Sequence, residues 1–176
     1  MKRIYALITL LLVGALAVDA SAQSSKLYGK WTIEGESIHM FAAEDVTPTS
    51  GYLLFNDDGT GEIVINMNVM VALDDTYDAN VATTTTSRFT WKYTSSVVVM
   101  ELNSYLSRFN DISFIPNDGA MNEHKSLILK VMNQSAEAEA MNYEPEEWLY
   151  VVSVVDKNHL QFVSAGEVIA LERAKR

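Results

Sequence analysis

The chain contains no cysteine among its 176 residues. Disulfide bonds, thiol catalysis and thiolate metal sites are therefore excluded, because each of them requires a cysteine side chain. A lipid anchor attached to a cysteine behind an N-terminal leader is excluded for the same reason. The folded state must then be stabilised by an apolar core and by a hydrogen-bonded sheet, and not by covalent cross-links.

Basic residues are also few. The sequence has 13 Lys and Arg residues against 23 Asp and Glu residues, which gives a net charge of −10. Nucleic acids and anionic membrane surfaces both attract proteins with a basic surface. The charge balance therefore argues against a nucleic-acid partner and against binding to an anionic membrane.

Motifs for catalysis or for metal binding are missing as well. The three histidines, His39, His124 and His159, have no second histidine two or four residues away, so none of them forms a metal pair on one strand or helix. The acidic segment 56–61 lacks the full calcium-loop pattern with its distal glutamate and is interpreted as a hairpin turn. The cluster of Asp74, Asp75, Asp78 and Asn80 is interpreted as a solvated loop, with weak calcium binding as the alternative. No nucleophile elbow, phosphate-binding loop or dinucleotide fingerprint is present. We therefore expect a protein without enzymatic activity, metal or cofactor.

The N-terminus has the three parts of a secretory signal peptide. Lys2 and Arg3 precede an apolar run, Ile4–Val18, and the small residues Ala20–Ala22 follow it. The run is shorter than the roughly 20 residues that a membrane span needs. The alternative is an uncleaved N-terminal anchor. The pattern predicts cleavage before Gln23, a periplasmic or secreted protein, and no transmembrane segment in the mature chain.

Residues 23–176 show the features of a single all-β domain. Apolar residues alternate with polar ones, and turn signals such as Asp58-Gly59 separate the alternating runs. Segment 44–50 is expected to be a loop, Ile38–Phe41 a weak strand or a flap, Ser104–Ile115 a strand or a lid, and the insert at 134–143 a short helix. Strands are predicted at Lys30–Gly35, Tyr52–Asn56, Glu62–Met70, Ala82–Tyr93, Val97–Leu102, Lys125–Met132, Glu147–Val155, Leu160–Ser164 and Val168–Arg173.

About eight to ten antiparallel strands fit either a sandwich or an up-and-down barrel. Arg173 has the same parity as Ile169 and Leu171 and should point inward with them. A guanidinium inside the fold needs a partner, and the face of an indole stabilises a cation. Trp31 can supply that face, which favours the barrel.

Four motifs in order resemble the bacterial lipocalin-like domain proteins, which are exported small β-barrels. These are the Leu-x-Gly-x-Trp opening at Leu27–Trp31, the hairpin Leu53–Gly61, the Phe-x-Trp strand at Phe89–Trp91, and a last strand ending in Arg173. The Thr-Asp-Tyr-like turn of true lipocalins is not evident. The resemblance implies a barrel that Gly29, Trp31 and Arg173 close at one end, with an apolar interior for a small hydrophobic ligand.

Strand parity suggests which residues form the wall of that interior. Tyr105 and Phe109 are candidates for a lid over the open end. Acidic loops at the mouth would disfavour an anionic head group, so we expect a neutral or cationic apolar ligand and a monomeric protein. The candidate ligand-binding residues are Ile65, Met67, Phe89, Met100, Leu129 and Val131.

A different class of function is also compatible with the sequence. Small barrels are often filled by their own side chains. Such a barrel would act as a protein-interaction or inhibitor module through its loops, which we expect at 42–51, 74–81 and 116–124. A cavity lined by the candidate residues favours ligand binding, whereas a solid core with an exposed apolar patch favours the interaction module.

Overall fold

Eight antiparallel strands form a closed barrel in which each strand pairs with its neighbours in sequence, from β1 to β8. The computed structural model describes residues 25–41, 46–117 and 119–175. The fold-class prediction is therefore confirmed: the chain is an all-antiparallel up-and-down barrel with a helical insert. Its elements are β1 (Gly29–Ile33), η1 (Gly35–Phe41), β2 (Val46–Phe55), β3 (Thr60–Ala72), β4 (Asp78–Thr94), β5 (Val97–Ile115), α2 (Gly119–Glu123), α3 (Lys125–Ala140), β6 (Glu146–Val154), β7 (His159–Ser164) and β8 (Glu167–Arg173).

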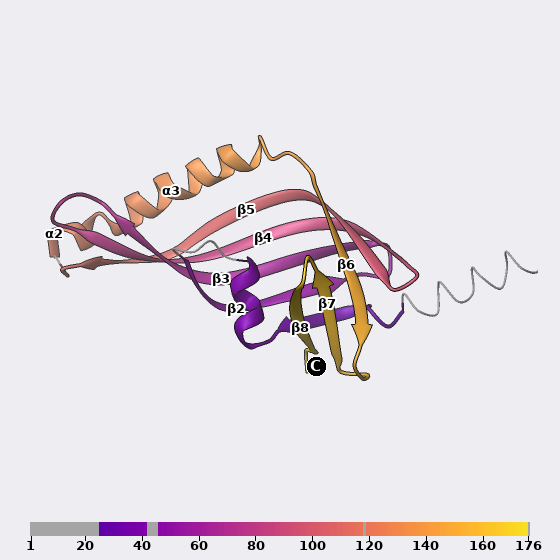
Figure 1. The fold of residues 1–176 in the computed structure, drawn as a ribbon. Coiled ribbons are helices and arrows are strands. Elements are labelled where there is room, and N and C mark those ends of the chain that lie inside the picture. Colours follow the sequence, from indigo (N-terminus) through magenta and orange to yellow (C-terminus); the bar gives the residue numbers. More distant parts are fainter. Residues whose placement is uncertain (1–24, 42–45, 118, 176) are drawn as a thin grey trace, which may run out of the picture.

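Three strands are much longer than the barrel requires. β3, β4 and β5 have 13, 17 and 19 residues, whereas β6 pairs only with the first part of β5, Val97–Leu102. Beyond Leu102 the long strands leave the barrel as a twisted sheet, and α3 lies along β5 there (Figure 1). A second small core forms between this sheet and α3, centred on Ala79, Val81, Ile112 and Phe114.

Two β-bulges interrupt the alternation of β5. Asn103 and Asn110 have no register partner on β4, so the inward-facing parity of β5 changes twice. Leu102 faces the first core, which is the apolar interior of the barrel around Trp31, Phe55 and Phe162. Phe109 faces inward with the opposite parity, and Ile112 returns to the original one. The bulges explain why the Ser104–Ile115 sequence looks mixed although it is a continuous strand. The strand alternative for this segment is therefore the one observed.

The prediction of a strand at Lys125–Met132 is wrong, because these residues form the first half of α3. Ile128, Met132 and Ala136 are spaced four residues apart, and this stripe faces the sheet. Leu129 packs beside it on the second core, whereas Val131 is 54% exposed. Neither Leu129 nor Val131 therefore belongs to the barrel wall, which corrects two of the expected ligand-binding residues.

Two further expectations are corrected near the N-terminus. Of the two alternatives for Ile38–Phe41, a strand or a flap, the strand is wrong, because this segment lies in the 3₁₀ helix η1. Within the expected loop at 44–50, β2 already begins at Val46, where it pairs with the extended part of β3. Residues 42–45 lie outside the described residues.

The edge of β5 that β6 does not cover is protected by a side chain from α3. The Asn133 amide nitrogen donates to the Phe109 carbonyl at 3.0 Å, and its amide oxygen accepts from the Phe109 N–H at 2.9 Å. Asn133 therefore replaces a neighbouring strand at this point. Lys125 and Asp111 add an ion pair between α3 and β5. Covering an open edge in this way prevents it from pairing with another chain.

Replacing Asn133 with alanine is expected to lower the free energy of unfolding by about 1–3 kcal/mol, because it leaves the Phe109 N–H and carbonyl without partners. Urea unfolding followed by circular dichroism measures the change. The exposed neighbour Gln134 is the matched control, and its alanine variant should stay within about 0.5 kcal/mol of the wild type. If the two variants are equally stable, Asn133 does not protect the edge.

Candidate functional site

A pocket of about 340 Å³ lies where the long strands leave the barrel. Strands β3 to β6 supply most of its wall, η1 supplies one residue, and the segment that follows α3 supplies another. Because side chains alternate along a strand, β3, β4 and β6 each contribute residues two positions apart. On β5 the two lining residues, Leu102 and Tyr105, are three positions apart, because the bulge at Asn103 lies between them. The lining residues are Phe41, Ile63, Ile65, Thr85, Ser87, Leu102, Tyr105, Tyr143, Glu146 and Trp148.

The deep part of the pocket is apolar, and one side of it carries hydroxyl groups. Ile63, Ile65 and Leu102 are at most 3% exposed and belong to the first core. Thr85 and Ser87 are buried on the neighbouring strand β4. An apolar surface with a few polar groups is typical of sites that bind small molecules, because the polar groups orient the ligand.

A chain of hydroxyl groups runs from this wall to the rim. Thr85 Oγ1 lies 3.2 Å from Ser107 Oγ, which donates to the Tyr105 hydroxyl at 3.1 Å. The Tyr105 ring stacks on Tyr143, with centroids 6.2 Å apart and planes inclined by 19°. The contact joins β5 to the segment that follows α3, so the helix position and the rim of the pocket are linked.

The opposite part of the rim combines an aromatic pair with a carboxylate. Phe41 from η1 packs against Trp148 of β6 at 6.3 Å between ring centroids. The Trp148 indole N–H donates to a Glu146 carboxylate oxygen at 3.2 Å. Partial burial, together with the negative charge of Glu146, raises the pKa of Tyr143. Glu146 therefore acts electrostatically on both sides of the rim.

The structure brings only some of the predicted residues to this pocket. Ile65 lines it, and so does Tyr105 from the expected lid. Phe89 and Met100 are buried in the barrel core but do not line it, and Met67 packs against that core half-buried. The other lid candidate, Phe109, packs on the second core. Its backbone N–H and carbonyl form hydrogen bonds with the Asn133 amide.

Sequence reasoning missed the hydroxyl wall and most of the rim. A signal for the wall was present: Thr85 and Ser87 have the same parity as Phe89 and Trp91, and so point to the interior of the same strand. No comparable signal marks Phe41, Tyr143 or Trp148, because elements far apart in sequence bring them together.

The other end of the barrel is closed by Trp31 and Arg173, which are register partners on β1 and β8. The guanidinium carbon lies 4.2 Å from the indole centroid. Arg173 also donates to the carbonyls of Lys26 and Tyr28 at 3.0 Å each. Gly29 has φ +112°, and a Cβ there would lie 3.2 Å from the guanidinium, so glycine fits best at this position.

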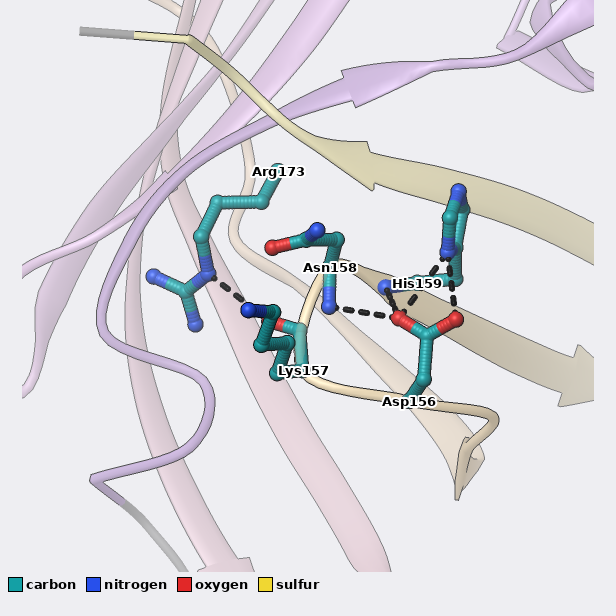
Figure 2. A network of polar contacts seen from close by, with 5 residues as sticks. All are labelled: Asp156, Lys157, Asn158, His159 and Arg173. Atoms are coloured by element: carbon teal, nitrogen blue, oxygen red, sulfur yellow. Dashed lines mark hydrogen bonds and ion pairs between the residues drawn. The ribbon is translucent and has the colours of Figure 1, made fainter.

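A turn between β6 and β7 completes this closure (Figure 2). Arg173 Nε donates to the Lys157 carbonyl at 3.2 Å, and the Arg173 backbone N–H donates to the Asn158 carbonyl at 2.7 Å. The Asp156 carboxylate holds the turn through the N–H of Asn158 and the ring of His159. These hydrogen bonds lower the pKa of Asp156, and its carboxylate raises the pKa of His159.

No group of three or more His, Asp or Glu side chains in the described parts of the chain is placed to hold a metal ion. Among the same residues, no helix has the length and apolar character needed to cross a membrane.

Comparison with known proteins finds no matching family model and no matching curated protein. The class of the protein is therefore defined by its architecture: a closed eight-stranded antiparallel β-barrel with a lined pocket at the base of a sheet extension.

Proposed function

We propose that this chain is an exported lipocalin-like protein that binds a small, mainly apolar molecule in the pocket between β3, β4, β5 and β6. The observation that supports the proposal is the pocket itself. Its volume of about 340 Å³ lies within the range of sites for small molecules. Its deep wall is apolar, and the hydroxyls of Thr85 and Ser87 lie beside that wall.

The alternative, an interaction module that acts through its loops, has less support. All three expected loops are partly regular structure: β2 begins at Val46, β4 begins at Asp78, and α2 occupies Gly119–Glu123. The feature that favours this alternative is an outward row of valines across four strands, Val97, Val151, Val163 and Val168.

Export is part of the proposal and rests on the sequence alone, because residues 1–24 lie outside the described residues. The first described segment is nevertheless anchored to the barrel: the Leu27 carbonyl accepts a hydrogen bond from the Trp31 indole at 2.7 Å. A mature chain that begins at Gln23 would keep this anchor intact.

Native mass spectrometry of the mature protein, purified from its own host, tests the proposal directly. We expect the mass of one chain plus a small molecule that is released when the protein is denatured. The released molecule would give the ligand class. A clean ligand-free mass, with no shift when a panel of small apolar compounds is added, would contradict ligand binding and favour the interaction module.

Filling the pocket is expected to abolish binding. The variant Thr85→Phe places a ring in the pocket and should weaken binding of a neutral, environment-sensitive naphthalene dye by at least about tenfold, or 1.4 kcal/mol. The matched control is Thr86→Phe, because Thr86 points to the opposite face of β4. Fluorescence titration measures both. Equal affinities in the two variants would show that the dye binds elsewhere.

A further inference from the structure

The residues at the rim of the pocket restrict the kind of ligand more than an apolar interior alone would. We infer that the pocket binds an organic ammonium ion, with the cationic group at the rim and the apolar part against Ile63, Ile65 and Leu102. This inference rests on the proposed function, since it concerns the same pocket. Three features of the rim support it: its aromatic rings, its single charged residue and the absence of any cation from its wall.

Four of the ten lining residues are aromatic, and all four lie at the rim. They form two pairs, Phe41 with Trp148 and Tyr105 with Tyr143. Aromatic faces attract cations through their quadrupole, and quaternary ammonium ions are typically bound between several such rings. Strongly hydrated metal ions prefer oxygen ligands instead, so a rim of this kind favours an organic cation.

Glu146 is the only charged residue that lines the pocket. The hydrogen bond from the Trp148 indole holds its carboxylate beside the aromatic rings. Within the described residues, Glu146 takes part in none of the three ion pairs, and no Lys, Arg or His lines the pocket. A carboxylate without a counter-ion at an aromatic rim is complementary to an ammonium group.

The negative charge around the pocket also favours a cationic ligand. Glu147 and Glu101 are register partners on the outer faces of β6 and β5, one residue from the rim. The whole chain has a net charge of −10. A negative potential raises the local concentration of cationic ligands and lowers that of carboxylates. A fatty-acid-like ligand would place its charge against Glu146, without a basic partner in the pocket wall.

Three compounds that differ only in the head group test the inference: 4-phenylbutyl-trimethylammonium, 4-phenylbutanol and 4-phenylbutyrate. Isothermal titration calorimetry with the mature protein should give an affinity for the ammonium compound at least tenfold higher than for the alcohol. The carboxylate should bind more weakly than the alcohol. Because the apolar part is constant, the ratios report on the rim alone.

Two glutamine variants locate the effect. Glu146→Gln should lower the affinity for the ammonium compound at least fivefold and leave the affinity for the alcohol unchanged. Glu147→Gln removes the same charge from the opposite face of the same strand and should change neither affinity by more than twofold. A loss of the same size in both variants would assign the preference to the overall charge and overturn the role of Glu146.

The remaining outcomes separate this inference from the proposed function. If all three compounds bind to the wild type with equal affinity, the pocket binds apolar molecules but has no preference for cations, and the inference is wrong. If none of them binds, both the inference and the proposed function are contradicted.

Discussion

Replacing Trp31 with alanine is expected to lower the free energy of unfolding by about 3–5 kcal/mol. The indole is 1% exposed in the first core, so its removal leaves a cavity. The variant also loses the hydrogen bond from the indole N–H to the Leu27 carbonyl and the face on which the Arg173 guanidinium lies. Urea unfolding, with a check that the slope m is unchanged, measures the loss as a change in native-state stability.

Two milder variants separate the parts of this effect. Trp31→Phe retains most of the apolar volume but has no N–H, so its cost should lie between those of the wild type and alanine. Arg173→Lys keeps the positive charge but has no planar fork for the carbonyls of Lys26, Tyr28 and Lys157. We expect it to cost about 1–3 kcal/mol. An alanine variant within 1 kcal/mol of the wild type would show that the closure is not a stabilising element.

This closure is also the part of the fold that the sequence predicted in most detail. Alternation places Arg173 on the inward face with Ile169 and Leu171, and a buried guanidinium demands a partner. Trp31 is that partner in the structure. Only the period of a strand and one electrostatic requirement are needed for this prediction, and both can be taken from the sequence.

The position of the helix could not be obtained in the same way. Between Lys125 and Met132 the apolar residues are so dense that a strand and a helix fit equally well. The structure decides in favour of the helix because the stripe that includes Ile128 and Met132 covers the second core. That core consists of parts of β4 and β5 outside the barrel, and nothing in the helix sequence reveals it.

The bulges limited the prediction of the site. A single extra residue reverses the parity of all later side chains in a strand. Asn103 and Asn110 introduce two such reversals in β5, so inward positions beyond Leu102 cannot be read by simple alternation. Ile65, on the regular strand β3, lines the pocket and has the inward parity that simple alternation gives it, whereas residues from η1 and from the segment after α3 were not foreseen.

Gly61→Ala is the second variant with a large expected effect, a loss of about 3 kcal/mol. Gly61 pairs with Phe55 on β2 and with Phe89 on β4, and the Phe89 ring lies over it. A Cβ at this position would overlap both the Phe89 ring and the Leu54 carbonyl oxygen. The backbone oxygen cannot move aside without disturbing the β2–β3 ladder.

The overlap would also displace Phe89 from its aromatic neighbours. Phe89 packs edge-on against Phe55 at 5.4 Å between centroids, and Phe55 contacts Trp91 and Phe162 in turn. The matched control is Gly119→Ala, because nothing lies within 4 Å of a Cβ there. Thermal and urea unfolding should show a large loss of stability for Gly61→Ala and almost none for Gly119→Ala.

Because Gly61 does not line the pocket, the folded fraction of Gly61→Ala should still bind the neutral dye with the wild-type affinity. A weaker affinity would instead mean that the packing of the aromatic core also sets the shape of the pocket.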